Sequence, residues 1–176
     1  MKHLLRALMI ITIITVGCEK KTTDSDKNKN DLNTYSSSNV KENTDYFSFA
    51  NNSGSTDANS DHDIVFFTVQ WQPVPQAPVI NDPQFKVKDG LSIAVLNSTN
   101  LEDVNEVPNT AIFVDNFLSE FGEWYYETDA HLILPYEKVY IVNTADGNFP
   151  AFQIKSYYDD MGNSGIYSID WKYLSE

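Results

Sequence analysis

Two runs of β-branched and aromatic residues flank a tight turn between Val139 and Tyr158, in the stretch VYIVNTADGNFPAFQIKSYY. Asp146-Gly147 lies near the centre of this stretch, and glycine supplies the positive φ that a tight hairpin turn requires. β-Branched and aromatic side chains suit the pleated surface of a half-buried sheet. The stretch therefore predicts a β-hairpin, and a chain built around such hairpins has a mainly β fold.

Strand patterns of the same kind recur along most of the chain. The predicted strands are 46–49, 64–71, 85–87, 91–96, 131–134, 138–144, 152–158 and 166–174. One helix is predicted over Asn109–Phe121, where apolar residues recur at helical spacing and Gly122 supplies a stop. The expected fold class is mainly β, with antiparallel sheets and one short helix.

The N-terminus, MKHLLRALMIITIITVGC, predicts a lipoprotein signal peptide. Its apolar run, 7–16, is too short to span a bilayer as a helix, because that takes about 20 residues. The run ends in Thr15-Val16-Gly17-Cys18, which resembles the bacterial lipobox, whose cysteine is diacylated and becomes the mature N-terminus. We therefore predict a signal peptide over 1–17 and lipidation of Cys18. Ordinary signal-peptidase cleavage, with an incidental cysteine, is the alternative.

Residues 18–44 are predicted to be the lipidated cysteine and a flexible tether, because Lys, Asp, Asn, Ser and Thr dominate and few side chains could enter a core. Residues 45–176 then form one domain with five lysines and 20 Asp and Glu. A surface this acidic repels phosphate backbones, so nucleic acid is excluded as a partner. The expected location is the cell envelope, with the lipid anchor holding the domain at the outer membrane or cell surface.

The order of motifs in this domain resembles that of the HmuY family. The stretch from Val139 to Tyr158, followed by GIYSIDWKY (165–173), is similar to the family's C-terminal signature of an aromatic strand, a Thr-Ala-Asp-Gly turn and a final strand of alternating aromatics. The upstream segments that resemble the family are DYFSF (45–49), HDIVFF (62–67) and EWYYE (123–127). The resemblance implies a β-rich lipoprotein that captures haem, or a similar flat apolar ligand, and passes it to an outer-membrane receptor.

The resemblance also implies two axial haem ligands, His or Met, from loops outside the signature. His131 is the first candidate because it lies near the expected second ligand loop; the alternative is an ordinary histidine at a strand edge. His62 and Met161 are further candidates, each with a purely structural alternative in a strand or a turn. No His or Met lies between Asp63 and Ala130, where the first ligand is expected. Haem held by one ligand, haem held by a tyrosinate, and no haem binding therefore all stay open.

No pattern of catalytic residues accompanies these motifs: the chain has neither a nucleophile elbow nor a glycine-rich phosphate loop, so we predict that it is not an enzyme. The oxygen-rich stretch DANSDHD (57–63) is either a cation site or a solvated loop, and it lacks the spacing of an EF-hand. Two functions remain, a lipid-anchored haem carrier and a surface interaction lipoprotein that keeps the scaffold without binding haem. The proline-rich segment 72–83 favours the second.

Overall fold

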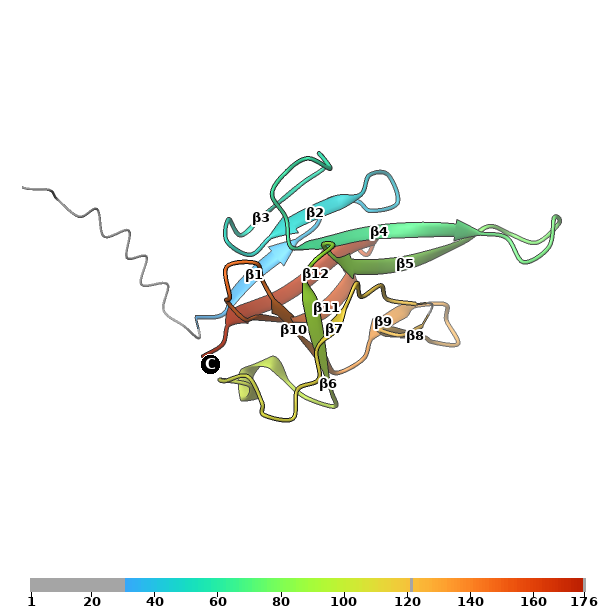
Figure 1. Cartoon of the computed structure of the whole chain (residues 1–176). Helices are drawn as coiled ribbons and strands as arrows, with labels where there is room; N and C mark the ends of the chain where they lie inside the picture. The colour runs from blue at the N-terminus through green and yellow to red at the C-terminus, as the bar shows by residue number, and fades with distance from the viewer. Residues whose placement is uncertain (1–30, 121, 176) are drawn as a thin grey trace, which may run out of the picture.

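The computed structural model describes residues 31–120 and 122–175, so the predicted signal peptide, Cys18 and the first part of the predicted tether lie outside the described residues. The described residues form twelve strands and one 3-10 helix (Figure 1). The prediction of a mainly β fold with antiparallel sheets is confirmed. No helix within these ranges combines the length and the apolar character needed to cross a bilayer.

Two antiparallel sheets form the body of the domain, in the orders β1-β12-β11-β10-β6-β7 and β3-β2-β4-β5. The strands of the larger sheet are β1 (Asn33–Ser36), β6 (Ser92–Asn97), β7 (Val114–Asp115), β10 (Lys138–Asn143), β11 (Pro150–Tyr158) and β12 (Ser164–Tyr173). Those of the smaller sheet are β2 (Asp45–Ser48), β3 (Ser53–Ser55), β4 (Ile64–Trp71) and β5 (Ile80–Val87). A separate hairpin of β8 (Tyr125–Glu127) and β9 (Ile133–Pro135) belongs to neither sheet.

The hairpin predicted between Val139 and Tyr158 is formed by β10 and β11. Gly147 adopts a φ of 77° in its turn. The Thr144 hydroxyl donates to Asp146 Oδ1 at 2.5 Å, and the Asn148 side-chain amide donates to Asp146 Oδ2 at 2.6 Å. The acidic residue of this turn therefore has a structural role, because its carboxylate joins the two sides of the turn.

Aromatic side chains fill the core between the two sheets. The Phe66 and Tyr167 rings, one from each sheet, have centroids 4.7 Å apart, and those of Phe49 and Trp171 lie 5.1 Å apart. All four side chains are almost completely buried. The alternation predicted for the last strand is confirmed, since Tyr167, Ile169 and Trp171 all face this core. Close-packed rings make the sandwich a rigid support for the segments at its edges.

The prediction of a helix over Asn109–Phe121 is wrong for residues 109–120, the part of this segment that the structure describes. This segment pairs with both sheets instead. Val114 joins the edge of the larger sheet through β6, while the Ser119 amide donates to the Phe85 carbonyl at 2.8 Å at the edge of the smaller one. Backbone groups used in this way cannot form a helix, and the β-branched and aromatic residues here are weak helix formers. The one helical turn in the described residues is the 3-10 helix at Leu101–Asp103.

The folded domain begins before residue 45, its predicted start. Strand β1 lies inside the predicted tether and pairs with β12, with Tyr35 opposite Ile169. The Tyr35 hydroxyl donates to Asp45 Oδ1 at 2.6 Å, and Val40 is buried in the main core. The sequence NTYS does not predict a strand because it is mostly polar. In the structure its residues alternate between half-buried and exposed positions, as expected of an edge strand.

Candidate functional site

The β8–β9 hairpin is fixed to the body at its base. The Trp124 indole donates to the Pro83 carbonyl at 2.8 Å, and the Tyr125 hydroxyl donates to Asp82 Oδ1 at 2.9 Å. Trp124 and Tyr125 are both buried, whereas most residues further along the hairpin are exposed. The Trp and the first Tyr of EWYYE thus hold the hairpin to β5. The Ile133 amide donates to the Tyr158 hydroxyl at 2.9 Å, so β9 is also held to β11, and the turn between β8 and β9 lies at the periphery of the domain (Figure 1).

A closed turn at the tip of this hairpin carries His131. The Thr128 amide donates to the Leu132 carbonyl at 2.9 Å, and the His131 amide donates to the Thr128 carbonyl at 2.8 Å. His131 adopts a φ of 60°, in the left-handed region, which is uncommon for a residue with a side chain. Such conformations cost about 1–3 kcal/mol and are often found at ligand sites. The hydrogen bonds of the turn hold His131 in this conformation.

The imidazole of His131 is hydrogen-bonded to a carboxylate four residues earlier in the chain. Nδ1 lies 2.5 Å from Glu127 Oε1, and the His131 side chain is 88% exposed. The carboxylate can only accept, so Nδ1 donates to it, and in the neutral imidazole this arrangement leaves the lone pair on Nε2. Nε2 makes no hydrogen bond to any residue in the described part of the chain. A histidine that ligates a metal usually donates its other ring N–H to such a carboxylate.

A cleft of about 630 Å³ lies beside the hairpin, and we call it the hairpin cleft. Tyr126 and Tyr136 form one wall, with ring centroids 5.4 Å apart. The Lys138 ammonium lies 5.4 Å from the centroid of the Tyr136 ring and donates to the Glu123 carbonyl. A cleft of this size fits a small molecule. The two phenol rings, tilted by 40° to each other, supply its aromatic surface, and most of its other lining residues are polar or charged.

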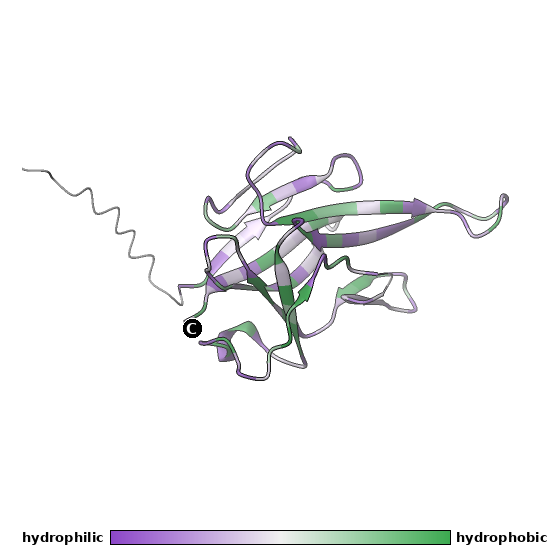
Figure 2. Cartoon of the chain, viewed as in Figure 1, coloured by the Kyte–Doolittle hydropathy of each residue, from purple (hydrophilic) through white to green (hydrophobic). Residues whose placement is uncertain are grey.

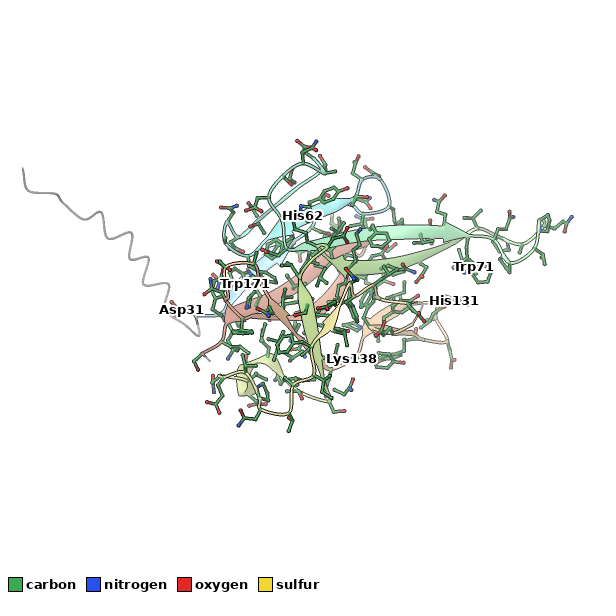
Figure 3. All side chains as sticks on the ribbon, viewed as in Figure 1. Asp31, His62, Trp71, His131, Lys138 and Trp171 are labelled. Carbon is green, nitrogen blue, oxygen red and sulfur yellow. The ribbon has the colours of Figure 1, made fainter. Side chains whose placement is uncertain are left out.

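The other two candidate ligands lie elsewhere in the fold, and Figure 3 shows His62 away from His131. His62 lies on the outer side of the smaller sheet, where Nδ1 donates to the Ser60 carbonyl at 2.8 Å and the ring packs edge-on against Tyr46 at 5.0 Å. Met161 lies in the β11–β12 turn and is 84% exposed. No hydrogen bond or ring contact within the described residues links either of them to His131. The structure therefore does not form a pair of axial ligands from these three residues.

The oxygen-rich stretch 57–63 uses its carboxylates to shape loops. Asp57 Oδ1 accepts the Asn59 amide at 2.9 Å, and Asp63 Oδ2 accepts the Phe49 amide at 2.9 Å. Burial raises the pKa of Asp63, and the Phe49 amide opposes that shift. Across 31–120 and 122–175, no group of three or more His, Cys, Asp and Glu side chains is placed to hold a metal ion.

Sequence reasoning missed Glu127 and the hairpin cleft. Glu127 could have been identified from its position four residues before His131, because a tight turn brings residues at that spacing together. No comparable signal exists for Tyr126 and Tyr136, since their approach depends on the pairing of β8 with β9 and on the course of the chain after β9.

Comparison with known proteins connects this geometry to a family. A family model described as HmuY protein matches residues 15–171. No curated protein sequence matches the chain. Apo PinO from Porphyromonas gingivitis superposes with a TM-score of 0.54 at 12% identity, covering 82% of this chain and 98% of that chain. BF2707 from Bacteroides fragilis, named as a lipoprotein, superposes with a TM-score of 0.55 at 16% identity, covering 82% and 90%.

At these identities the two solved structures show a shared fold. The family model shows more, because it matches most of the chain, including the C-terminal signature and the EWYYE segment. The resemblance predicted from the motifs is confirmed, and the chain belongs to the HmuY family, a family of binding proteins.

Proposed function

We propose that this chain is a lipid-anchored haem-capturing protein of the cell envelope, in which the β8–β9 hairpin presents His131 to the haem iron. The observation that carries the proposal is the hydrogen bond from His131 Nδ1 to Glu127, which leaves Nε2 to bind a metal. Membership of the HmuY family supports haem as the ligand. The role is capture and delivery, without catalysis.

Apolar side chains on the same hairpin as His131 would supply the surface for the macrocycle. Tyr126, Leu132 and Leu134 are all between 36% and 48% exposed on this hairpin. Register places Tyr126 opposite Leu134, so their side chains share one face of the hairpin. A flat apolar ligand covering this face would bury these side chains and stabilise the complex by about 25 cal/mol per Å² of apolar surface.

The coordination we propose uses His131 as the single protein ligand of the iron. Low-spin haem proteins need a ligand on each face of the macrocycle, and no other His or Met among the described residues contacts the hairpin tip. His131 would therefore be the one histidine or methionine of the described residues to hold the iron.

Anchoring through Cys18 would hold the domain at the membrane. Each buried methylene of an acyl chain contributes about 0.8 kcal/mol, and stable anchoring takes more than one chain. The lipobox resemblance and the naming of BF2707 as a lipoprotein support this part of the proposal. Metabolic labelling with a palmitate analogue should label the native chain and not Cys18→Ser, and equal labelling of both would disprove acylation at this residue.

Titration with hemin tests haem capture. The native chain should give a saturable shift of the Soret band, which His131→Ala should abolish. His62→Ala and Met161→Ala are matched controls that should bind hemin as the native chain does. Absence of a saturable shift in both the ferric and the ferrous state would remove haem from the proposal, and loss of binding in the His62 variant would move the site to the smaller sheet.

A second candidate function is a surface interaction lipoprotein that keeps the fold and binds no haem. Strands β4 and β5 with the turn between them form a long hairpin, which we call the β4–β5 ribbon. The observation that favours the second function is the exposed distal part of this ribbon, where Trp71, Val74 and Val79 are between 43% and 56% exposed. On this reading, replacing 72–79 with a Gly-Ser loop of equal length would abolish binding of an outer-membrane receptor, while hemin would leave the spectrum of the native chain unchanged.

A further inference from the structure

The outer face of the smaller sheet carries apolar side chains where polar residues are usual in a sandwich of two sheets. Register places Tyr46, Val65 and Lys86 opposite one another on neighbouring strands, so their side chains share one face. The adjacent row, which includes Phe47 and Ile64, is fully buried in the core between the sheets. The row that contains Val65 therefore faces away from that core.

Strand β4 extends this face as an apolar stripe, made of Val65, Phe67, Val69 and Trp71 at alternate positions. Exposure increases along the stripe, from 3% at Val65 to 37% at Val69 and 43% at Trp71. Figure 2 shows apolar residues along much of β4. No residue of β4 is charged. On β5, register places Gln84 opposite Phe67 and Asp82 opposite Val69. Asp82 is buried, and its carboxylate accepts from Tyr125 and Gln84. The stripe thus has a closed end at the body and an open end towards the ribbon tip.

A cleft of about 640 Å³ lies at the closed end of the stripe, and we call it the sheet cleft. Its lining includes Tyr46, His62, Val65, Phe67, Lys86 and Lys88. It has no lining residue in common with the hairpin cleft among the described residues. The two clefts are therefore separate sites, and occupation of one does not require the other.

Two of the few lysines of the domain lie at the sheet cleft. Residues 45–176 contain only five lysines against 20 acidic residues, and two of the five, Lys86 and Lys88, line this cleft. The Lys86 ammonium makes no hydrogen bond or ion pair with any residue that the structure describes. Lys88 lies 3.5 Å from Asp61, but both side chains are well exposed, at 42% and 79%, so this pair is weak. Asp89 also borders the cleft. Of the lining cations, Lys86 is the one available to an anionic ligand.

We propose that the sheet cleft and the stripe bind a single-chain amphiphilic carboxylate. Its carboxylate would contact Lys86, and its hydrocarbon chain would lie along β4 towards Trp71. At about 3.3 Å per residue, the distance from Val65 to Trp71 is about 20 Å, which accommodates a long alkyl chain. A charged head beside Lys86 and an apolar body on the stripe match the chemistry of each end of the site.

Calorimetry with decanoate below its micelle concentration tests this site. We expect saturable binding that Lys86→Gln weakens about tenfold, because the charge-assisted contact to the head is lost. Lys155→Gln is the matched control, since Lys155 is an exposed lysine on β11 of the other sheet. From octanoate to dodecanoate, affinity should increase about two- to fourfold for each methylene buried on the stripe. Decanol should bind at least tenfold more weakly than decanoate.

Tryptophan emission gives a second readout. Trp71 is 43% exposed, whereas Trp124 and Trp171 are buried, so Trp71 should dominate any blue shift when the alkyl chain arrives. Val69→Asp should remove both the blue shift and the dependence on chain length. It lies on the exposed part of the ribbon, so we expect the variant to fold.

Three results would overturn the proposal: equal affinity of the native chain and Lys86→Gln, affinity independent of chain length, and decanol binding as tightly as decanoate. Binding of phosphatidylglycerol vesicles without binding of monomeric decanoate would also overturn it, in favour of a lipid surface. Hemin affinity should be the same in Lys86→Gln and the native chain. The carboxylate site and the haem site can therefore be disproved separately.

Discussion

The sandwich core and the β8–β9 hairpin both contain tyrosines, but the two regions leave them with different chemistry. Tyr140 and Tyr167 are buried in the core, where burial raises the pKa of each phenol. Tyr126 and Tyr136 are 44% and 42% exposed at the hairpin. A buried phenol that cannot ionise has no use as a metal ligand, whereas an exposed one can contact a ligand. The core therefore supplies rigidity, and ligand binding is left to the segments at its edges.

Truncation of a core ring should have the largest effect on stability. Phe66 is fully buried against Tyr167 and Phe85, so Phe66→Ala should lower the free energy of unfolding by about 4 kcal/mol through lost burial and a cavity. Tyr126→Ala at the hairpin should cost less than about 1 kcal/mol. Urea denaturation measures both. Similar losses for the two variants would mean that the hairpin is part of the cooperative core.

The turn after β10 should be sensitive to backbone conformation alone. Gly147 has a φ of 77°, and a Cβ added there would meet nothing within 4 Å. Gly147→Ala should therefore cost about 1–2 kcal/mol of unfolding free energy from the left-handed conformation. Gly147→Asn is the matched variant and should cost less, because Asn tolerates this conformation better. Equal losses would show that the turn relaxes to another conformation.

Acid should remove the contribution of Asp146 to stability. The hydrogen bond from Thr144 lowers the pKa of Asp146 below its ordinary value of 3.8. A carboxyl with a lowered pKa in the folded state stabilises that state above its unfolded pKa, and this stabilisation is lost as the pH falls through the folded pKa. The difference in unfolding free energy between the native chain and Asp146→Asn should therefore be full at pH 7 and shrink below about pH 4. A difference that does not change with pH would assign the loss to geometry alone.

The smallest effect is expected from an unpaired hydroxyl in the core. The Tyr140 hydroxyl is buried without a hydrogen-bond partner among the described residues. Tyr140→Phe should raise the free energy of unfolding by up to about 1 kcal/mol, because a buried unsatisfied group is removed. Tyr126→Phe, at the exposed hairpin, should change it little. Thermal denaturation compares the two variants, and clear destabilisation by Tyr140→Phe would show that the hydroxyl has a partner.

The sequence predicts the strands well because their signals are local. Each of the eight predicted strands overlaps a strand of the structure, and β4 matches at both ends. The segment around Val114 was predicted as a helix because its apolar spacing fits one, and this failed because both sheets offer it backbone partners. Strand β1 was missed because a polar edge strand needs only the pairing with β12, which lies far away in the sequence.

The candidate site was only partly predictable. His131 could be placed by its position relative to the EWYYE segment, but its partner Glu127 and its positive φ depend on how the turn closes. Both clefts form between segments that are distant in the sequence, so no local pattern predicts their shape. Whether His131 binds the metal stays a prediction.

The central claim is that His131 binds the metal of the ligand through Nε2, and nitrogen-15 labelling of histidine tests it most directly. The chain contains three histidines, of which His62 and His131 lie in the folded domain. On titration with diamagnetic gallium protoporphyrin, the account predicts a large shift of the His131 Nε2 resonance, while Nδ1 stays protonated and the His62 resonances do not move. A complex that forms with the His131 resonances unchanged would contradict the account.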